Sequence, residues 1–310
     1  MRHHSFSTAI FAAGLLTGAT AAQAANESWV SGTGTDAGTC PRTAPCRTFQ
    51  FAHDQTNNNG AINVLASGNF GPLTISKPIS IVAQGAEAVI NTAANGAAIT
   101  VQAGGGANVS LRGLTIDMRG TGNKGINFLS GAALHVWDTV IRKTTDGISF
   151  APASGTPELY VANSIFEDAA GASQGIIVVP SGSAGARVVL NSIRAENSGN
   201  GVLFDGGSTT GSINATVRDS VFAGNTGSGI AVSDDGGVAN VMIDRSAMVN
   251  NTSGLSIVNA NNGDVWIGDS TVTGNGTGLN NGSNLLVSYG TNKVNGNGTD
   301  GAANGVGTMK

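Results

Sequence analysis

The sequence predicts an all-β protein whose chain winds into a stack of parallel coils, a β-solenoid, and three observations support this. A short segment recurs between Leu134 and Leu279, in which a buried aliphatic residue precedes Asp or Asn, then Ser or Thr, then Gly and an apolar alternation. The alternation has period 2, and Gly, Asn and Ser separate its runs. The spacing is also nearly constant. The aligned hydroxyl residues are Thr139, Ser164, Ser192, Ser220, Ser246 and Ser270, with gaps of 25, 28, 28, 26 and 24 residues.

The composition fits a narrow interior filled by small side chains. Of the 310 residues, 47 are Gly, 11% are charged and 5% are aromatic. The net charge of −4, with Lys and Arg scattered along the chain, argues against a nucleic-acid partner, because such an interface needs clustered positive charge. A hydrophobic content of 40% in regular alternation also argues against disorder.

The first 24 residues have the pattern of a secretory signal peptide. Arg2 precedes an apolar run at 9–16, and the small residues Ala22 and Ala24 form a cleavage site. We therefore expect a secreted protein, in the periplasm, at the cell surface or outside the cell, without a membrane span after signal removal. A retained anchor is the alternative, although the run is short for a transmembrane helix.

Two cysteines, Cys40 and Cys46, lie close together in a loop with two prolines. In an oxidising compartment we expect them to pair as a disulfide. A metal site that uses both cysteines with His53 is the alternative, but it has only three candidate ligands. We assign residues 25–61 to an N-terminal lead-in that holds this loop and a helix cap, and residues 62–310 to the solenoid domain.

The elements follow from local patterns along the chain. Residues 28–31 form a strand candidate in the lead-in, and residues 47–56 carry apolar positions at helical spacing. This amphipathic helix would cover the open hydrophobic end of the stack. Short strands separated by Gly, Pro and Ser follow, three in each of about nine coils. The expected strands of the first two coils are 62–65, 73–75, 79–82, 88–90, 99–101 and 109–111.

Stacking of the coils predicts columns of like residues. One inward column is expected to contain Val136, Val161, Val189, Val217, Ile243 and Ile267, and another Ile148, Ile176, Val202, Ile230, Leu255 and Leu279. Turn residues align as well, at Asn197, Asn225, Asn251 and Asn275. Because Asn tolerates left-handed turns and stacked amides can hydrogen-bond to one another, these four residues predict a structural Asn ladder.

The segments GTGTDAGTCPRTAPCRTFQFAHDQT and INVLASGNFGPLTISKPISIVAQG, followed by the Ser, Asn and Gly pattern of the coils, resemble the secreted right-handed parallel β-helix proteins of the pectin-lyase-like superfamily. The resemblance implies an all-β, right-handed parallel β-helix with a short N-terminal capping helix. It leaves the activity open, because this fold is found in pectate lyases, polygalacturonases, epimerases, phage tailspikes and many proteins of no known activity.

In the pectate lyases of this group, calcium-binding carboxylates and a catalytic Arg lie on the outer face of the sheet that corresponds to the Gly-initiated strands. The outward positions here are Asn127, Ser149, Ile177, Leu203, Ala231, Ser256 and Asn280, and none is charged. Only Asp146 adds a carboxylate just before a Gly, so we predict no metal or cofactor; calcium would enter only if the protein were a lyase.

The remaining catalytic candidates are few. Asp234 and Asp235 lie in the segment SDDGG, which is more typical of a solvated turn than of an acid and base pair. A polar column precedes the aligned hydroxyls, at Asp138, Asn163, Asn191, Asp219, Arg245 and Asp269. This column could bind sugar hydroxyls, or its residues could simply favour the bend between strands.

Four ring-bearing residues are expected to point outward: His135, Trp137, Tyr160 and Trp266. Exposed rings with polar tips can stack on the C–H face of a pyranose while nearby amides bind its hydroxyls. Alternatively, a loop or a neighbouring subunit covers them.

Two main hypotheses for the function follow, with a tailspike-like or adhesin assembly as a third. The first is a non-catalytic carbohydrate-binding or structural surface protein, whose partner is a polysaccharide or the cell envelope. The second is a polysaccharide lyase, glycoside hydrolase or epimerase that acts on an acidic polysaccharide near Asp138, Asp146 or Asp234. The oligomeric state is left open.

Overall fold

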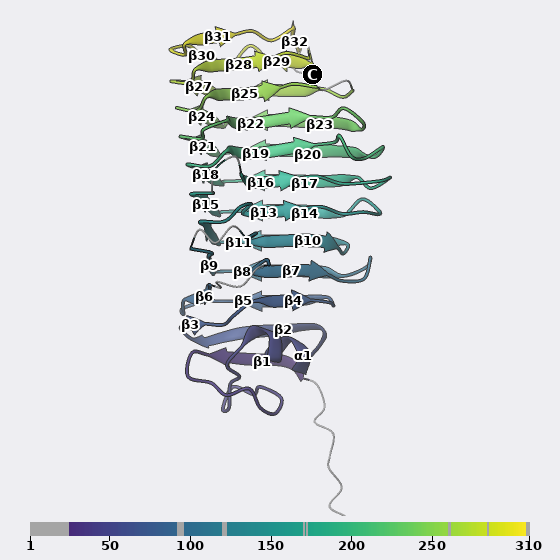
Figure 1. Ribbon diagram of the computed structural model, residues 1–310, viewed down its shortest axis with the longest axis vertical. Coiled ribbons are helices and arrows are strands. Elements are labelled where there is room, and N and C mark those ends of the chain that lie inside the picture. Colours follow the sequence, from purple (N-terminus) through teal and green to yellow (C-terminus); the bar gives the residue numbers. More distant parts are fainter. Residues whose placement is uncertain are drawn as a thin grey trace, which may run out of the picture.

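The protein is a right-handed parallel β-helix in the computed structural model, which describes residues 25–91, 96–119, 123–169, 171, 173–259, 262–283 and 285–307. Its coils stack along one axis, from the N-terminal coils at the bottom of Figure 1 to the C-terminal coils at the top. The strands form three sheets of 12, 10 and 10 strands, and strands that are one coil apart pair in parallel. The predicted fold class is confirmed.

We call the sheets A, B and C. In spatial order, sheet A contains β1 (Ala25–Ser31), β2 (Thr56–Ala66), β5 (Ile79–Val82), β8 (Asn108–Arg112), β11 (Ala133–Trp137), β14 (Glu158–Ala162), β17 (Ala186–Asn191), β20 (Ser212–Arg218), β23 (Val238–Asp244), β26 (Val265–Gly268), β29 (Leu286–Ser288) and β32 (Gly305–Val306). Sheet B contains β3 (Gly68–Asn69), β6 (Ala88–Ile90), β9 (Leu114–Asp117), β12 (Val140–Arg142), β15 (Ile165–Glu167), β18 (Arg194–Glu196), β21 (Val221–Ala223), β24 (Ala247–Val249), β27 (Thr271–Thr273) and β30 (Lys293–Val294). Sheet C contains β4 (Leu73–Ile75), β7 (Ile99–Gln102), β10 (Ile126–Ser130), β13 (Ile148–Phe150), β16 (Gln174–Val178), β19 (Asn200–Asp205), β22 (Ser228–Ser233), β25 (Ser253–Ile257), β28 (Thr277–Asn281) and β31 (Thr299–Gly301).

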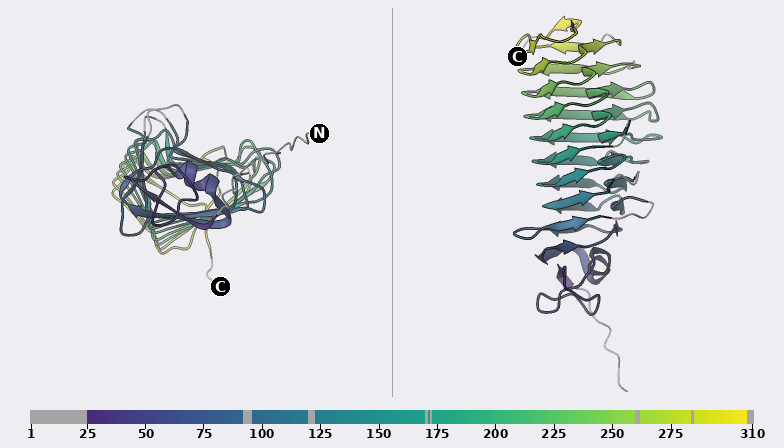
Figure 2. Two further views of the ribbon diagram at one scale, coloured as in Figure 1. Left: turned by 90° about the horizontal axis from the view of Figure 1, so that it is seen from below. Right: turned by 60° about the vertical axis from the view of Figure 1, so that its left-hand side comes forward.

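A short helix, α1 (Phe49–Gln55), lies across the interior at the N-terminal end, as the view along the axis in Figure 2 shows. The Thr48 hydroxyl caps this helix by accepting from the Phe51 N–H. Its apolar side packs onto the first coil, where the Phe49 ring lies 4.8 Å from that of Phe70. His53 is buried there and its Nε2 accepts from the Ser76 N–H at 3.3 Å, and burial lowers the pKa of this imidazole.

The lead-in is part of the stack. Strand β1 pairs with β2 and continues sheet A, so the predicted boundary between residues 61 and 62 falls inside β2. Cys40 and Cys46 form a disulfide, as predicted, and their sulfurs are therefore not available as metal ligands. The predicted signal peptide, residues 1–24, lies outside the described residues. No helix in the described part of the chain is long and apolar enough to cross a membrane.

The core consists of stacked aliphatic and Phe side chains that face inward from all three sheets. The predicted column that begins at Ile148 is confirmed, because its residues pair one coil apart through Ile176, Val202, Ile230, Leu255 and Leu279. Parallel strands buried in this way read as apolar alternation in the sequence.

The other predicted column is wrong at one position. Leu190, and not Val189, pairs with Val161 on one side and Val217 on the other. Val189 points outward, in register with Tyr160 and Thr216. The run from Val188 to Leu190 is apolar at every position, so alternation alone does not choose its face. A shift of one residue along the strand exchanges its inward and outward faces. The register observed is the one in which Ala186, Val188 and Ile193 are buried.

The same one-residue shift corrects three further assignments. The polar column contains Ser192 and not Asn191, and all its members have a positive φ: Asp138, Asn163, Ser192, Asp219, Arg245 and Asp269. Ile193 therefore takes the place among the aligned hydroxyl residues that we predicted for Ser192, and its N–H donates to Ser220 Oγ. In the Asn ladder, Ser198 takes the place predicted for Asn197, because its N–H donates to Asn225 Oδ1. Asn197 is the left-handed residue just before it.

Candidate functional site

The outer face of sheet A carries a cluster of three rings, His135, Trp137 and Tyr160, which we call the aromatic patch. His135 and Tyr160 pair in register on β11 and β14, and Trp137 is two residues beyond His135 on the same outward side. The His135 ring centroid lies 5.3 Å from that of Trp137 and 6.0 Å from that of Tyr160, and the two larger rings are 5.9 Å apart. All three side chains are half-buried, so each leaves part of its ring accessible to solvent.

Two hollows lie further along the same face. The larger, about 600 Å³, is lined by Arg187, Val188, Val189, Asn214, Ala215, Thr216, Asn240, Met242, Trp266 and Tyr289. The smaller, about 300 Å³, adjoins it and is lined by Thr216, Arg218, Met242, Asp244, Gly268, Asp269, Tyr289 and Thr291. The register places Val189, Thr216, Met242 and Trp266 in one row that continues from Tyr160. The hollows and the aromatic patch therefore share one row of outward side chains.

A second pair of rings lies in these hollows. Trp266 pairs with Met242 and with Val287, and Tyr289 is the second residue after Val287. Glycine at position 268 allows the Tyr289 ring to approach the sheet, because a Cβ at Gly268 would lie only 3.1 Å from Tyr289 Cδ2. The face thus presents ring surfaces near both ends of its row.

Polar side chains border this row on the side where the chain enters sheet A. Asn240 Nδ2 donates to Asn214 Oδ1 at 3.0 Å, and both amides remain in part exposed. Arg187, the neighbour of Asn214 on the next strand, is exposed and makes no ion pair with the residues that the structure describes. Glu158 lies beside His135 with 3.3 Å between Oε1 and Nε2. This border offers hydrogen-bond donors and acceptors, together with one positive charge at Arg187.

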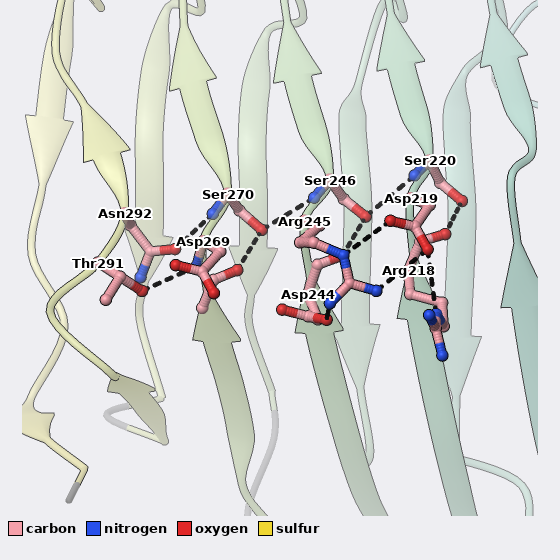
Figure 3. A network of polar contacts seen from close by, with 11 residues as sticks. Arg218, Asp219, Ser220, Asp244, Arg245, Ser246, Asp269, Ser270, Thr291 and Asn292 are labelled. Atoms are coloured by element: carbon pink, nitrogen blue, oxygen red, sulfur yellow. Dashed lines mark hydrogen bonds and ion pairs between the residues drawn. The ribbon is translucent and has the colours of Figure 1, made fainter. Parts of the chain in front are cut away.

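The opposite border is the corner where sheet A turns into sheet B, shown in Figure 3. Arg245 Nε donates to Asp219 Oδ1 at 2.9 Å and its Nη1 also contacts Asp244, while Arg218 Nε donates to Asp219 Oδ2 at 3.1 Å. These hydrogen bonds, first from Arg245 and then from Arg218, lower the pKa of Asp219. Asp219 therefore stays ionised at neutral pH, and charge at this corner is largely paired.

The other members of the polar column occupy the same corner on neighbouring coils. Asp138 is exposed and accepts from Arg112 Nε at 2.9 Å, and Asn163 Nδ2 lies 3.5 Å from Asp138 Oδ1. Each has a left-handed backbone, which Asp and Asn tolerate better than most residues do. Two of these side chains thus have a conformational role, and their outer atoms also border the aromatic patch.

The outer face of sheet C differs from that of sheet A because its outward row contains no aromatic side chain. Its outward row is Asn127, Ser149, Ile177, Leu203, Ala231, Ser256 and Asn280, as predicted from the sequence. Ser149 is only 1% exposed, and Lys124 Nζ donates to its hydroxyl at 2.8 Å.

Asp146 lies where the chain enters sheet C, and it has a structural partner. Its Oδ1 accepts from the Gln174 N–H on the next coil at 3.3 Å. Asn200 Oδ1 accepts from the Ser228 N–H in the same way, so an amide oxygen can accept the same hydrogen bond as this carboxylate. Burial raises the pKa of Asp146, although the Gln174 N–H and the nearby Lys124 oppose this shift.

The Asp234–Asp235 pair occupies a turn between sheets C and A. Asp234 is 0% exposed, and its carboxylate accepts from the N–H groups of Ala239 and Asn262 at 3.0 and 3.4 Å. A polysaccharide could not reach this carboxylate. Asp235 is exposed beside it, so the two carboxyl groups do not share one solvent-accessible cleft.

Metal ligands do not gather in the part of the chain that the structure describes. No group of three or more His, Cys, Asp and Glu residues there is arranged to hold a metal ion. The carboxylates that the sequence singled out are distributed over different corners of the coil: Asp138 after sheet A, Asp146 before sheet C, and Asp234 after sheet C.

Sequence reasoning identified His135, Trp137, Tyr160 and Trp266 but missed their neighbours on the same face. Those neighbours are Arg187, Asn214, Asn240, Met242 and Tyr289. Four of them could have been found by counting one residue outward from each inward aliphatic of sheet A. Tyr289 gave no such signal, because its coil departs from the repeated segment.

No protein-family model matches this sequence, and no curated protein matches it. Among solved structures, the chain is similar to the crystal structure of pectate lyase Pel9A, with a TM-score of 0.60 and 17% sequence identity over 84% of this chain and 74% of that chain. It also matches the A-module of the Azotobacter vinelandii mannuronan C-5 epimerase AlgE4, with a TM-score of 0.42 and 15% identity over 77% of this chain and 88% of that chain. The likeness to the lyase shows the fold alone, a right-handed parallel β-helix, in agreement with the fold that the sequence resemblance implies.

Proposed function

We propose that this protein is a secreted, non-catalytic carbohydrate-binding protein whose outer face of sheet A binds a polysaccharide, with the cell envelope as its setting. The observation that carries the proposal is the aromatic patch, in which His135, Trp137 and Tyr160 lie within 6.0 Å of one another and remain in part exposed. Rings of this kind combine an apolar surface with a polar tip.

The surroundings of the patch support the same function. A sugar ring offers apolar C–H faces and polar edges, so its site needs ring surfaces flanked by hydrogen-bonding groups. Sheet A supplies both, because its row of rings and aliphatic side chains runs between the Asn214 and Asn240 amides on one side and the charged corner around Asp219 on the other.

The environments of the catalytic candidates favour binding over catalysis. Asp146 and Asp234 each accept hydrogen bonds from backbone N–H groups of the stack, and Asp138 pairs with Arg112. A general acid or base must reach its substrate within hydrogen-bond distance. The three carboxylates lie at separate corners; Asp146 and Asp234 join neighbouring coils, whereas Asp138 is exposed and paired with Arg112.

The test is a binding screen of the mature protein against a panel of purified plant, bacterial and algal polysaccharides. The same mixtures, with calcium added, are assayed for new reducing ends and unsaturated products. We expect binding without product. Trp137→Ala and Tyr160→Ala should each weaken the binding by about 30-fold, or about 2 kcal/mol, because aromatic anchors contribute most to such interfaces.

Trp29→Ala is the matched control, since Trp29 is a half-buried Trp on the outer face of sheet A, four strands away on β1, with Arg42 packed over its ring at 5.0 Å. It should bind as the wild type does. Product formation would overturn the non-catalytic assignment. Failure to bind any polysaccharide would overturn the binding function and leave a structural role.

A further inference from the structure

A column of glycines lies at the start of the strands of sheet C, where successive coils come close together. In seven successive coils, a Cβ at the glycine would lie 2.4 to 2.8 Å from the carbonyl oxygen of the equivalent residue on the next coil. None of the seven has a positive φ, so space and not backbone conformation favours glycine here. Ala98, with a single methyl group, precedes them in the column. The glycines are Gly125, Gly147, Gly175, Gly201, Gly229, Gly254 and Gly278.

Asp300 occupies the next place in this column. Strand β31 pairs with β28 through Thr299 and Gly301, which places Asp300 between them and beside Gly278. A Cβ at Gly278 would lie 2.6 Å from the Asp300 carbonyl oxygen, as in the coils below. Strand β31 is the outermost strand of sheet C, at the top of Figure 1. The Asp300 side chain therefore takes up space that a further coil would need.

The carboxylate of Asp300 also completes the Asn ladder. Asn275 donates through its N–H and Nδ2 to Asn297 Oδ1, at 3.0 and 2.9 Å. Asn297 donates in the same two ways to Asp300 Oδ1, at 3.1 and 2.8 Å. For Asn275, as for Asn251 below it, the acceptor comes from the next coil. Asp300 supplies the same acceptor three residues away, in place of a further coil.

The N-terminal edge of sheet A is closed in a different way. The carbonyl groups of Cys40 and Cys46 accept from the N–H groups of Trp29 and Ser31, and the Cys46 N–H donates to the Trp29 carbonyl. The disulfide loop thus pairs with β1 on the edge that does not face β2, and α1 lies across the interior. A second copy is therefore blocked from adding strands at this end. Two copies that joined by their strand edges would meet at their C-terminal ends, related by a two-fold axis.

The C-terminal edge of sheet A favours such a contact. Strand β32 is the outermost strand of this sheet, and its Val306 is 78% exposed. An exposed apolar strand with unpaired backbone groups is a template for pairing with another chain. A residue on the neighbouring edge of sheet C that prevents the approach of a second copy would keep this end solvated.

We propose that Asp300 closes the C-terminal end of the β-helix against pairing with a second copy of this chain. Its side chain fills the place of the next strand, and its carboxylate satisfies the last amide of the Asn ladder. In a two-fold contact between two β31 strands, the two Asp300 carboxylates would also face each other, and like charges on paired strands are destabilising.

The substitution Asp300→Gly introduces the residue that the other coils carry and tests the proposal. Sedimentation velocity of the purified mature protein, from about 5 to about 200 μM, measures association by its dependence on concentration. We expect the variant, unlike the wild type, to shift towards a dimer over this range. At the lowest concentration, the Asn297 N–H should exchange with solvent about 10-fold faster than in the wild type, because it has lost its acceptor, while the Asn251 N–H stays protected.

Asp168→Gly is the matched control, because it removes an exposed carboxylate from a left-handed position in the middle of the stack. It should sediment as the wild type does. Adding Val306→Lys to Asp300→Gly places a charge on the same end and should abolish the dimer. Unchanged sedimentation of Asp300→Gly would overturn the proposal, since the end would then be closed without this side chain. A dimer that persists in the double variant, or that also forms in the control, would overturn it too, because the contact would lie elsewhere.

Discussion

Each coil turns at two corners that flank sheet B, and the two corners are built differently. At the corner between sheets A and B, the left-handed residue is exposed and its identity varies among Asp, Asn, Ser and Arg. At the corner between sheets B and C, the amides of Asn225, Asn251 and Asn275 are 2 to 4% exposed and hydrogen-bond to one another. At the first corner the left-handed residue is accessible to solvent and ligands, although Ser220, Ser246 and Ser270, which follow it, are buried; at the second corner the amides are part of the core.

The difference shows where this fold can acquire a function. In the buried ladder, Asn251 Nδ2 donates to Asn275 Oδ1 and to the Phe222 carbonyl. Asn251 Oδ1 accepts from both Nδ2 and the backbone N–H of Asn225. Each donor and acceptor is used, so few other residues fit. At the exposed corner the backbone conformation is constrained but the outer atoms are not, and there Asp219, Arg245 and Asp244 border the outer face of sheet A.

The largest effect on stability is expected from Asn251→Ala. Removing this amide takes the acceptor away from the buried Asn225 N–H and one hydrogen bond each from Asn225 Nδ2, the Phe222 carbonyl and Asn275 Oδ1, which should lower the free energy of unfolding by about 2 to 3 kcal/mol. Ser246→Ala at the corner between sheets A and B should cost about 1 kcal/mol, because the Ser220 N–H loses its acceptor, Ser246 Oγ, whereas the Asp244 carbonyl, which also loses the hydroxyl, keeps its hydrogen bond from the Asp219 N–H. Urea denaturation of both variants measures the difference.

Asn250→Gly is the control for the first variant, because it keeps the left-handed backbone beside the ladder and removes only an exposed side chain. Its free energy of unfolding should stay within about 0.5 kcal/mol of the wild type. Equal costs for Asn251→Ala and Ser246→Ala would show that the two corners do not differ in the way proposed here. Ile193 already occupies the serine position in one coil, which supports the smaller cost at the exposed corner.

A smaller effect, of opposite sign, is expected from Asp146→Asn. Burial raises the pKa of this carboxyl in the folded protein, so the folded state binds its proton more tightly than the unfolded state does. The ionised Asp146 carboxylate therefore lowers the free energy of unfolding of the wild type at neutral pH. This loss of stability disappears as the pH falls through the raised pKa towards the ordinary Asp value of about 3.9. The amide variant keeps the acceptor for the Gln174 N–H, as Asn200 does for Ser228.

Urea denaturation of Asp146→Asn at pH 7 and at about pH 4 tests this sign. We expect a gain of at most about 1 kcal/mol at pH 7, reduced because the side chain is only half-buried, and little difference at the acid pH. Glycan binding should not change. Asn200→Asp is the mirror variant and should lose stability as the pH rises. A loss of stability in Asp146→Asn at pH 7 would contradict the account.

The smallest effect is expected from Arg245→Gln at the exposed corner. The Arg245 hydrogen bond is the main cause of the lowered pKa of Asp219, so the pKa of this carboxyl should rise towards its ordinary value in the variant. NMR titration of the Asp219 carboxyl carbon measures the shift, and Arg194→Gln, on sheet B, is the control that should leave it unchanged. Stability should change little, because exposed ion pairs contribute little. A pKa of Asp219 that stays as low as in the wild type would assign the shift to Arg218 instead.

Much of the fold could be predicted because its signals are local and repeated. The inward column through Ile148, the cap at residues 47–56 and the disulfide all follow from alternation, helical spacing and the proximity of two cysteines in an expected oxidising compartment. The errors have one source. Aligning the coils on a hydroxyl placed Ser192 one residue out of register, and Val189, Asn191 and Asn197 shifted with it.

The candidate site was predicted less completely. Outward positions have no packing requirement, so nothing in the repeat distinguishes Met242 or Asn214 from an ordinary exposed residue until its neighbours on the adjacent coils are known. Asp146 and Asp234 were kept as catalytic candidates because the sequence could not show that backbone N–H groups already engage them.

By itself, the sequence determined that this chain forms a β-solenoid and which faces of most strands point inward, because period-2 alternation between regularly spaced turns can bury its apolar side only by stacking. Only the tertiary structure decided which outward side chains become neighbours. In a parallel stack, contacts on one face join residues that are a whole coil apart in the chain, and the coils differ in length. The alignment of Tyr160, Met242 and Trp266 in one row therefore depends on the register of every coil between them.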